Sequence, residues 1–147
     1  MIFDLVIYLL AQVTNPVSVD KNPEFFLLKQ HLEKYGFTVE IVMPPIRGNY
    51  GMLHTKSKKI WINPAVFELG IARPTLIHEA VHAAQLCRGE DQLQLLGVES
   101  LPPTFARPYF VRYKSPRREL EAEAYAVQAL SDGVEQVLAL LKQHCSV

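Results

Sequence analysis

Apolar positions recur at helical spacing over much of the chain, most clearly in its second half. The strongest pattern runs from Arg73 to Cys87, with Pro74 near its start and Gly89 just past its end. An earlier pattern begins at Asn22, which suits an N-cap and is followed directly by proline. The predicted helices cover residues 22–35, 64–69, 73–87, 91–96, 117–130 and 134–144.

Three shorter segments alternate in polarity or are rich in β-branched residues, which is typical of strands. They are residues 37–43 (FTVEIVM), 52–54 and 58–62 (KKIWI), with prolines and glycines in the loop before the second. Because the strands come early and most helices come later, the pattern predicts an α+β fold with a small antiparallel sheet.

Length and composition fit one domain over residues 1–147. Hydrophobic residues make up 49% of the chain and charged residues 20%, which are ordinary values for a chain that buries a core. Fifteen basic residues balance fifteen acidic ones, and this zero net charge argues against a nucleic-acid-binding protein. The two cysteines, Cys87 and Cys145, are too few for a disulfide framework.

The apolar N-terminal segment, Met1–Val13, needs to be distinguished from a targeting sequence. Asp4 interrupts it, no basic residue precedes it, and it is shorter than the roughly 20 residues that span a bilayer. We therefore expect a buried element there, no membrane span, and a cytoplasmic protein whose two thiols stay reduced.

One motif with specific chemistry lies inside the strongest predicted helix. His78-Glu79-Ala80-Val81-His82 has the form H-E-x-x-H, which random arrangement would rarely produce in a chain of this composition. Residues four apart share a helix face, so the rings of His78 and His82 can hold one zinc ion. Glu79 is turned by roughly 100° from His78 and can serve as a general base toward a metal-activated water. The simpler alternative is a core helix whose histidines bond to backbone.

A catalytic zinc site usually has a third protein ligand. The predicted helix that begins near Arg117 carries Glu119, Glu121 and Glu123. Glu119 and Glu123 share a face, so one of them is expected to bind the metal and the other to accept a histidine N–H. Glu121 points the other way and is expected to face solvent.

The HEAVH helix and the later E-L-E-A-E-A-Y-A helix together resemble the gluzincin branch of the zincin metallopeptidases, which includes thermolysin and the lethal-factor-type toxins. The resemblance covers residues 57–130. It implies a minimal zincin-like domain in which the sheet packs on the HExxH helix and on a second helix that supplies a metal ligand. It also implies that His78, His82 and Glu119 hold one Zn²⁺, with Glu123 as the acid that supports them.

The same resemblance assigns roles around the metal. In these families an edge strand before the HExxH helix binds extended substrate, and residues 58–62 match that place. A Tyr, His or Arg stabilises the oxyanion; Tyr113 is the candidate here and His54 a weaker one. The implied activity is zinc-dependent cleavage of a peptide or protein substrate, with Glu79 as general base. The alternative is a metal-binding or partner-binding module that does not catalyse.

Overall fold

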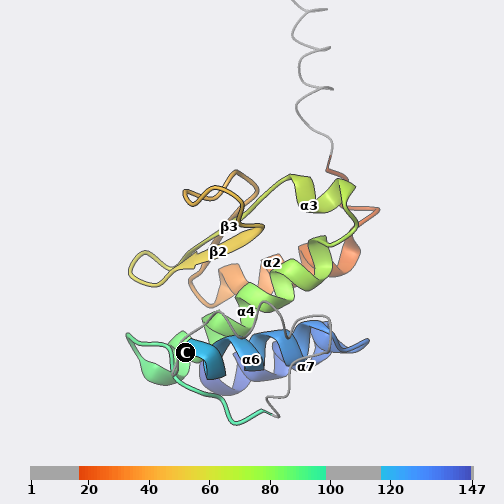
Figure 1. The fold of residues 1–147 in the computed structure, drawn as a ribbon. Helices are drawn as coiled ribbons and strands as arrows, with labels where there is room; N and C mark the ends of the chain where they lie inside the picture. Colours follow the sequence, from red (N-terminus) through yellow and green to blue (C-terminus); the bar gives the residue numbers. More distant parts are fainter. Residues whose placement is uncertain (1–16, 99–116, 147) are drawn as a thin grey trace, which may run out of the picture.

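The computed structural model describes residues 17–98 and 117–146 (Figure 1). Over these ranges the chain combines a small sheet with several helices, which agrees with the predicted α+β class. The helices are α2 (Pro23–Lys34), α3 (Ala65–Glu68), α4 (Ala72–Gly89), α6 (Arg117–Gln128) and α7 (Gly133–His144), and the strands are β1 (Thr38–Glu40), β2 (Gly51–His54) and β3 (Lys59–Ile62).

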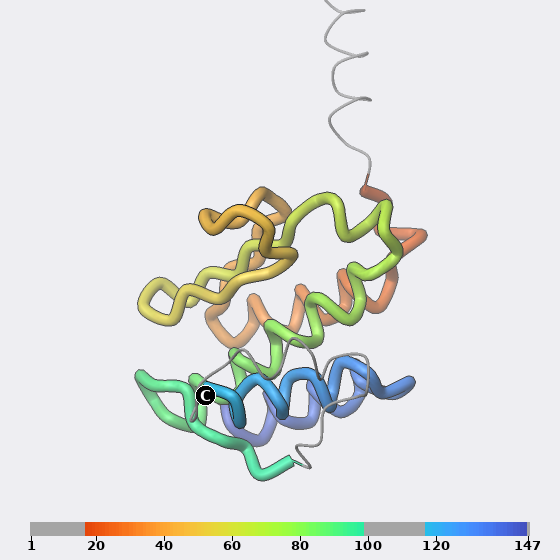
Figure 2. Tube along the Cα trace, in the orientation of Figure 1, coloured from red at the N-terminus to blue at the C-terminus, as the bar shows by residue number. Residues whose placement is uncertain are grey.

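Helix α4 lies in the middle of the described structure, with the sheet and α2 on one side and α6 and α7 on the other (Figures 1 and 2). Its apolar residues are buried around most of its circumference, as expected of an interior helix. The small side chains of Ala80, Ala83 and Ala84 allow neighbouring helices to approach closely. The residues that carry the H-E-x-x-H motif are therefore held on the most enclosed helix of the described structure.

Helix α2 follows the predicted pattern closely. Phe25, Leu28 and Leu32 recur at spacings of three and four and are all buried in the core. The chain leaves the helix at Gly36, whose φ of 94° lies in the left-handed region that glycine adopts without strain. This turn sends the chain directly into β1.

The sheet is mixed rather than antiparallel, and its strand order is β1-β3-β2. Strand β1 pairs with β3 in parallel, and β2 pairs with β3 antiparallel. Ile60 and Ile62 alternate into the core along β3. The expectation that residues 58–62 form an edge strand is wrong. Strand β3 is the central strand and pairs with β1 on one side and with β2 on the other. The strand at the edge toward α4 is β2.

The weak helix predicted at residues 91–96 is also wrong. Glu90 ends α4 with a φ of 67°, and residues 93–98 form no regular element. The backbone N–H groups of Leu96, Gly97 and Val98 instead donate hydrogen bonds to the carboxylate of Glu123. These hydrogen bonds to a residue far away in sequence outweigh the weak helix propensity of residues 91–96.

Two sequence-based predictions fall outside the described residues: the buried element at residues 1–13, and Tyr113. Across residues 17–98 and 117–146, no helix has both the length and the apolar character that crossing a bilayer requires.

A disulfide joins Cys87, near the end of α4, to Cys145, directly after α7. The expectation of two reduced thiols is therefore wrong. The two residues are 58 positions apart in sequence, and their proximity arises because α7 packs along α4. Such a cross-link restricts the unfolded chain and ties the C-terminal helix to the central one.

Reduction of this disulfide is expected to lower the free energy of unfolding by about 2–4 kcal/mol, since the closed loop is long. Denaturant unfolding with and without a thiol reductant measures the effect. The double variant Cys87→Ser/Cys145→Ser is the control: its stability should match that of the reduced protein and should not respond to reductant. Equal stability of oxidised and reduced wild type would contradict the structural role.

Candidate metal centre

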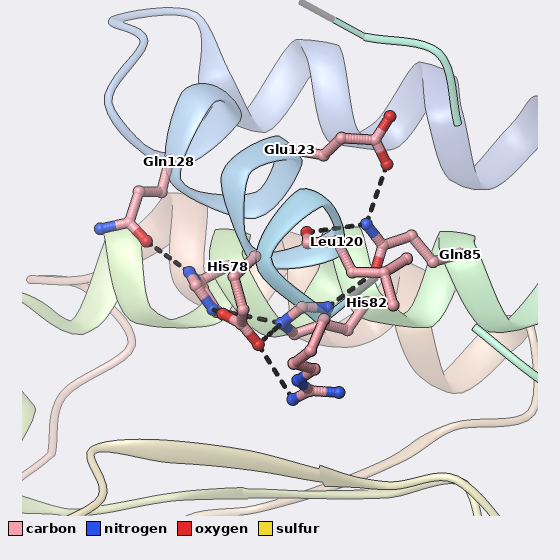
Figure 3. A network of polar contacts seen from close by, with 8 residues as sticks. His78, His82, Gln85, Leu120, Glu123 and Gln128 are labelled. Atoms are coloured by element: carbon pink, nitrogen blue, oxygen red, sulfur yellow. Dashed lines mark hydrogen bonds and ion pairs between the residues drawn. The ribbon is translucent and has the colours of Figure 1, made fainter. Parts of the chain in front are cut away.

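His78 and His82 lie on the face of α4 that packs against α6 (Figure 3). Their Nε2 atoms are 3.2 Å apart, and their rings meet edge to face. His82 is buried and His78 is half-buried. The helical spacing has thus brought the two rings together at one point, as the motif predicted.

Glu121 on α6 completes this group. One carboxylate oxygen lies 2.9 Å from His78 Nε2, and the other lies 3.1 Å from His82 Nε2. Arg117, one turn earlier on α6, donates from Nη2 to the same carboxylate at 2.9 Å. Within the described part of the chain, His78, His82 and Glu121 are the three side chains whose ligand atoms could hold one metal ion, all within 4.8 Å of one another.

The acid that the structure brings beside the histidines is not the one that the resemblance selected. Glu119, which the family resemblance selected, is exposed and takes no part in the group, whereas Glu121, expected in solvent, is buried. Helix α6 packs its apolar stripe of Leu120, Ala124 and Val127 into the core, and this fixes its rotation. At about 100° per residue, that rotation puts Glu121 on the flank nearest the histidines and Glu119 on the opposite flank.

Glu123 also differs from its expected place. Its carboxylate contacts neither histidine; it accepts from Gln85 and from the backbone of residues 96–98. The direct partners of the histidines are two glutamines instead. His78 Nδ1 donates to Gln128 Oε1 at 2.6 Å, and His82 Nδ1 donates to Gln85 Oε1 at 2.8 Å.

These contacts determine what the site can accept. An amide oxygen only accepts hydrogen bonds, so each ring must carry its proton on Nδ1. In a neutral ring, Nε2 is then a bare lone pair that faces the other ring and the oxygens of Glu121. Such a concentration of acceptors in a buried place is unfavourable without positive charge at its centre. A metal cation satisfies it, as does an extra proton on the rings.

The charge states of the metal-free site follow the same logic. Burial by itself lowers the pKa of His82, but the hydrogen bond to Glu121 and its charge, with smaller effects from Glu79 and Gln85, raise this pKa above the ordinary imidazole value. Burial would raise the pKa of Glu121, yet the hydrogen bonds from His78 and His82 hold it well below its usual range. The carboxylate is therefore charged, and without a metal it is paired with an extra proton on His82.

A cavity of about 810 Å³ opens in front of this group. Its walls include β2 and the loop before it, the start of α4, and one face of α6. Glu79 lies on its wall beside β2, with the side chain close to the backbone of Gly51. The general base proposed from the motif therefore faces the same space as the metal-binding group.

The remaining candidates divide clearly. His54, at the end of β2, is exposed and bonds to Ser57, and it is not part of the cavity wall. Tyr125, which the sequence did not single out, packs edge to face on His78 and lines the cavity. The spacing of Arg117, Glu121 and Gln128 at i, i+4 and i+11 offered a signal, because these positions follow one flank of the apolar stripe.

Comparison with protein-family models, with curated proteins and with solved structures finds no match to this chain. Function is therefore inferred from the geometry and chemistry of the site.

The metal site is tested by a matched pair of variants on one helix. We expect Glu121→Gln to weaken Zn²⁺ binding by more than the 10–100-fold typical of residues outside the coordination shell, because it removes a charged ligand. Glu119→Gln changes an exposed acid nearby and should leave affinity unchanged. Competition against a chromogenic chelator measures both values. Loss of binding in Glu119→Gln with retention in Glu121→Gln would restore the assignment that the resemblance made.

Proposed function

We propose that this chain is a zinc-dependent hydrolase that cleaves amide bonds in peptides or proteins. One observation supports the proposal above all. Glu79 lines the same cavity as His78, His82 and Glu121, the two imidazoles and one carboxylate that could hold a metal ion. Two histidines with one glutamate are a ligand set found in catalytic zinc sites, which keep one position for water.

The residues present suit zinc on chemical grounds. The donors are two imidazole nitrogens whose other nitrogens are already engaged by glutamine oxygens, and one ionised carboxylate. His78, His82 and Glu121 would hold the ion. When bound, zinc supplies Lewis-acid chemistry, lowering the pKa of water and polarising a carbonyl group.

The role of Glu79 follows from its position beside the two histidines. Its carboxylate accepts a proton from the attacking water and later delivers that proton to the amine nitrogen of the leaving group. Burial of Glu79, which is 6% exposed, limits competition from bulk water, and the neighbouring backbone of Gly51 restrains the side chain from the strand side. Arg117, a cation on the same cavity wall, holds the carboxylate of Glu121 in place.

The resemblance to the gluzincin metallopeptidases supports this activity, with one change of residue. The ligand from the second helix is Glu121 rather than Glu119. The edge strand available to an extended substrate is β2, whose residues Gly51, Met52 and Leu53 line the cavity, rather than residues 58–62. Tyr113 stays a proposed oxyanion donor from the sequence.

The disulfide bears on where the protein would act. Bonds of this kind persist mainly in oxidising compartments. The pairing of Cys87 with Cys145 therefore favours such a compartment over the cytoplasm that the sequence suggested.

Glu79→Gln is the direct test of catalysis. The variant should bind Zn²⁺ as wild type does, because no ligand is removed, while cleavage should fall by about 10²–10⁴-fold. The assay mixes metal-loaded protein with unfolded protein substrates and identifies new termini by mass spectrometry. Equal cleavage by both proteins would refute the role of Glu79. Absence of cleavage by wild type, with metal still bound, would favour the non-catalytic metal module instead.

Gly51→Ala tests whether close approach of β2 positions the base. A Cβ at this residue would lie 3.0 Å from Glu79 Cγ and 3.0 Å from Thr75 Cγ2, so the glutamate must move. We expect cleavage to drop about tenfold or more while Zn²⁺ affinity stays constant, since catalytic rates depend steeply on such placement. Steady-state kinetics and chelator competition separate the two effects. Unchanged kinetics would mean that Glu79 tolerates displacement.

A further inference from the structure

Gln85 is the most enclosed polar side chain next to the metal-binding group. It lies one turn after His82 on α4, has 0% exposure, and uses every part of its amide (Figure 3). Its Oε1 accepts from His82 Nδ1 at 2.8 Å, while its Nε2 donates to Leu120 O at 3.0 Å and to Glu123 Oε1 at 2.9 Å. Its polar atoms are therefore all engaged without water.

The direction of this amide is fixed by the groups around it. A flipped amide would place its oxygen against the Leu120 carbonyl and the Glu123 carboxylate, both of which are acceptors. It would also place an NH₂ group against His82 Nδ1. The pattern of donors and acceptors is therefore consistent in only one orientation, with the oxygen toward the imidazole.

Glu123 is the anchor of this arrangement. It is 1% exposed, and its oxygens accept from Gln85 and from the backbone N–H groups of Leu96, Gly97 and Val98, at 2.7–3.1 Å. The backbone donors leave the carboxylate no freedom to rotate away. Gln85 is thus held by an acceptor that is itself held by the main chain.

We propose that Gln85, locked by Glu123, is a positioning residue that keeps the proton of His82 on Nδ1 and so leaves Nε2 open to a metal ion. The inference rests on the metal site of the proposed function but not on its catalytic activity. It also differs from the direct contact between Glu123 and a histidine that the resemblance implied.

The alternative state of His82 shows why the lock matters. Nε2 lies 3.1 Å from the charged oxygen of Glu121. Without Gln85, the proton of a neutral ring is best placed on Nε2, where it is donated to that oxygen. This tautomer blocks the ligand lone pair, so a metal ion must first displace the proton and then bind a ring with an unpaired Nδ1.

The first test removes the amide group of Gln85 and keeps the approximate length and volume of the side chain. Gln85→Met should shift neutral, metal-free His82 from the Nδ1–H to the Nε2–H tautomer, seen in long-range ¹H–¹⁵N spectra at alkaline pH. Zn²⁺ affinity should fall by about 10–100-fold. Gln136→Met, which changes an exposed glutamine on α7, is the control and should alter neither reading. An Nδ1–H ring with unchanged affinity in Gln85→Met would overturn the proposal.

The second test covers the case in which Gln85→Met fails to fold, and it exchanges the two polar groups. Gln85→Glu alone sets two carboxylates against each other and should be destabilised. Combined with Glu123→Gln, the new acid accepts from both His82 Nδ1 and the new amide, whose oxygen still accepts from residues 96–98, while the Leu120 carbonyl loses its donor. Because an acceptor still faces His82 Nδ1, the double variant should be more stable than Gln85→Glu, keep the Nδ1–H tautomer, and bind Zn²⁺ at least as tightly as wild type.

An Nε2–H tautomer in the folded double variant would overturn the proposal, because an acceptor at Nδ1 would then not set the position of the proton. Both readings are made without substrate. A failure of peptide cleavage would therefore count against the proposed function and leave this inference standing. An Nε2–H tautomer of His82 in the wild type would overturn this inference and leave the proposed function standing.

Discussion

The contact between two imidazole rings and one carboxylate in the interior is the interaction on which the surrounding structure depends. Polar groups withdrawn from water are costly unless every donor and acceptor has a partner. Here His78, His82 and Glu121 are brought together between α4 and α6, and their facing atoms require a positive charge. Around the group, Gln128 and Gln85 accept from the outer nitrogen Nδ1 of each ring, so that both inner nitrogens face the carboxylate of Glu121.

The group has a closed side and an open side. On the closed side, Gln85 and Glu123 are fully buried and hydrogen-bonded to each other and to the main chain of residues 96–98. A rearrangement there would leave buried polar groups without hydrogen-bond partners. The disulfide from Cys87 secures the same end of α4 to the C-terminal helix. This side therefore holds the ring of His82 in one orientation.

The open side faces the cavity, and several of its residues are less buried. Gln128 and Tyr125 are half-buried against His78, and Arg117 is exposed at the rim. Glu79 projects here as well, next to the edge strand β2. A substrate that entered along β2 would therefore meet the base and the metal-binding group from the same direction, while the closed side held the histidines still.

The sequence by itself determined the helix that carries the chemistry and the pairing of His78 with His82, because both follow from spacings of three and four residues within one segment. It also predicted α2 closely, since a proline at the helix start, an apolar stripe and Gly36 all act locally. The choice between Glu119 and Glu121 was decided only in the folded chain: the stripe of Leu120, Ala124 and Val127 faces the core, but which of its two flanks lies against the histidines depends on how α6 packs on α4. The central place of β3, the contacts of Gln85 with Glu123, and the pairing of Cys87 with Cys145 likewise join residues far apart in sequence. They depend on which surfaces of the helices and strands meet, and that is a property of the tertiary structure alone.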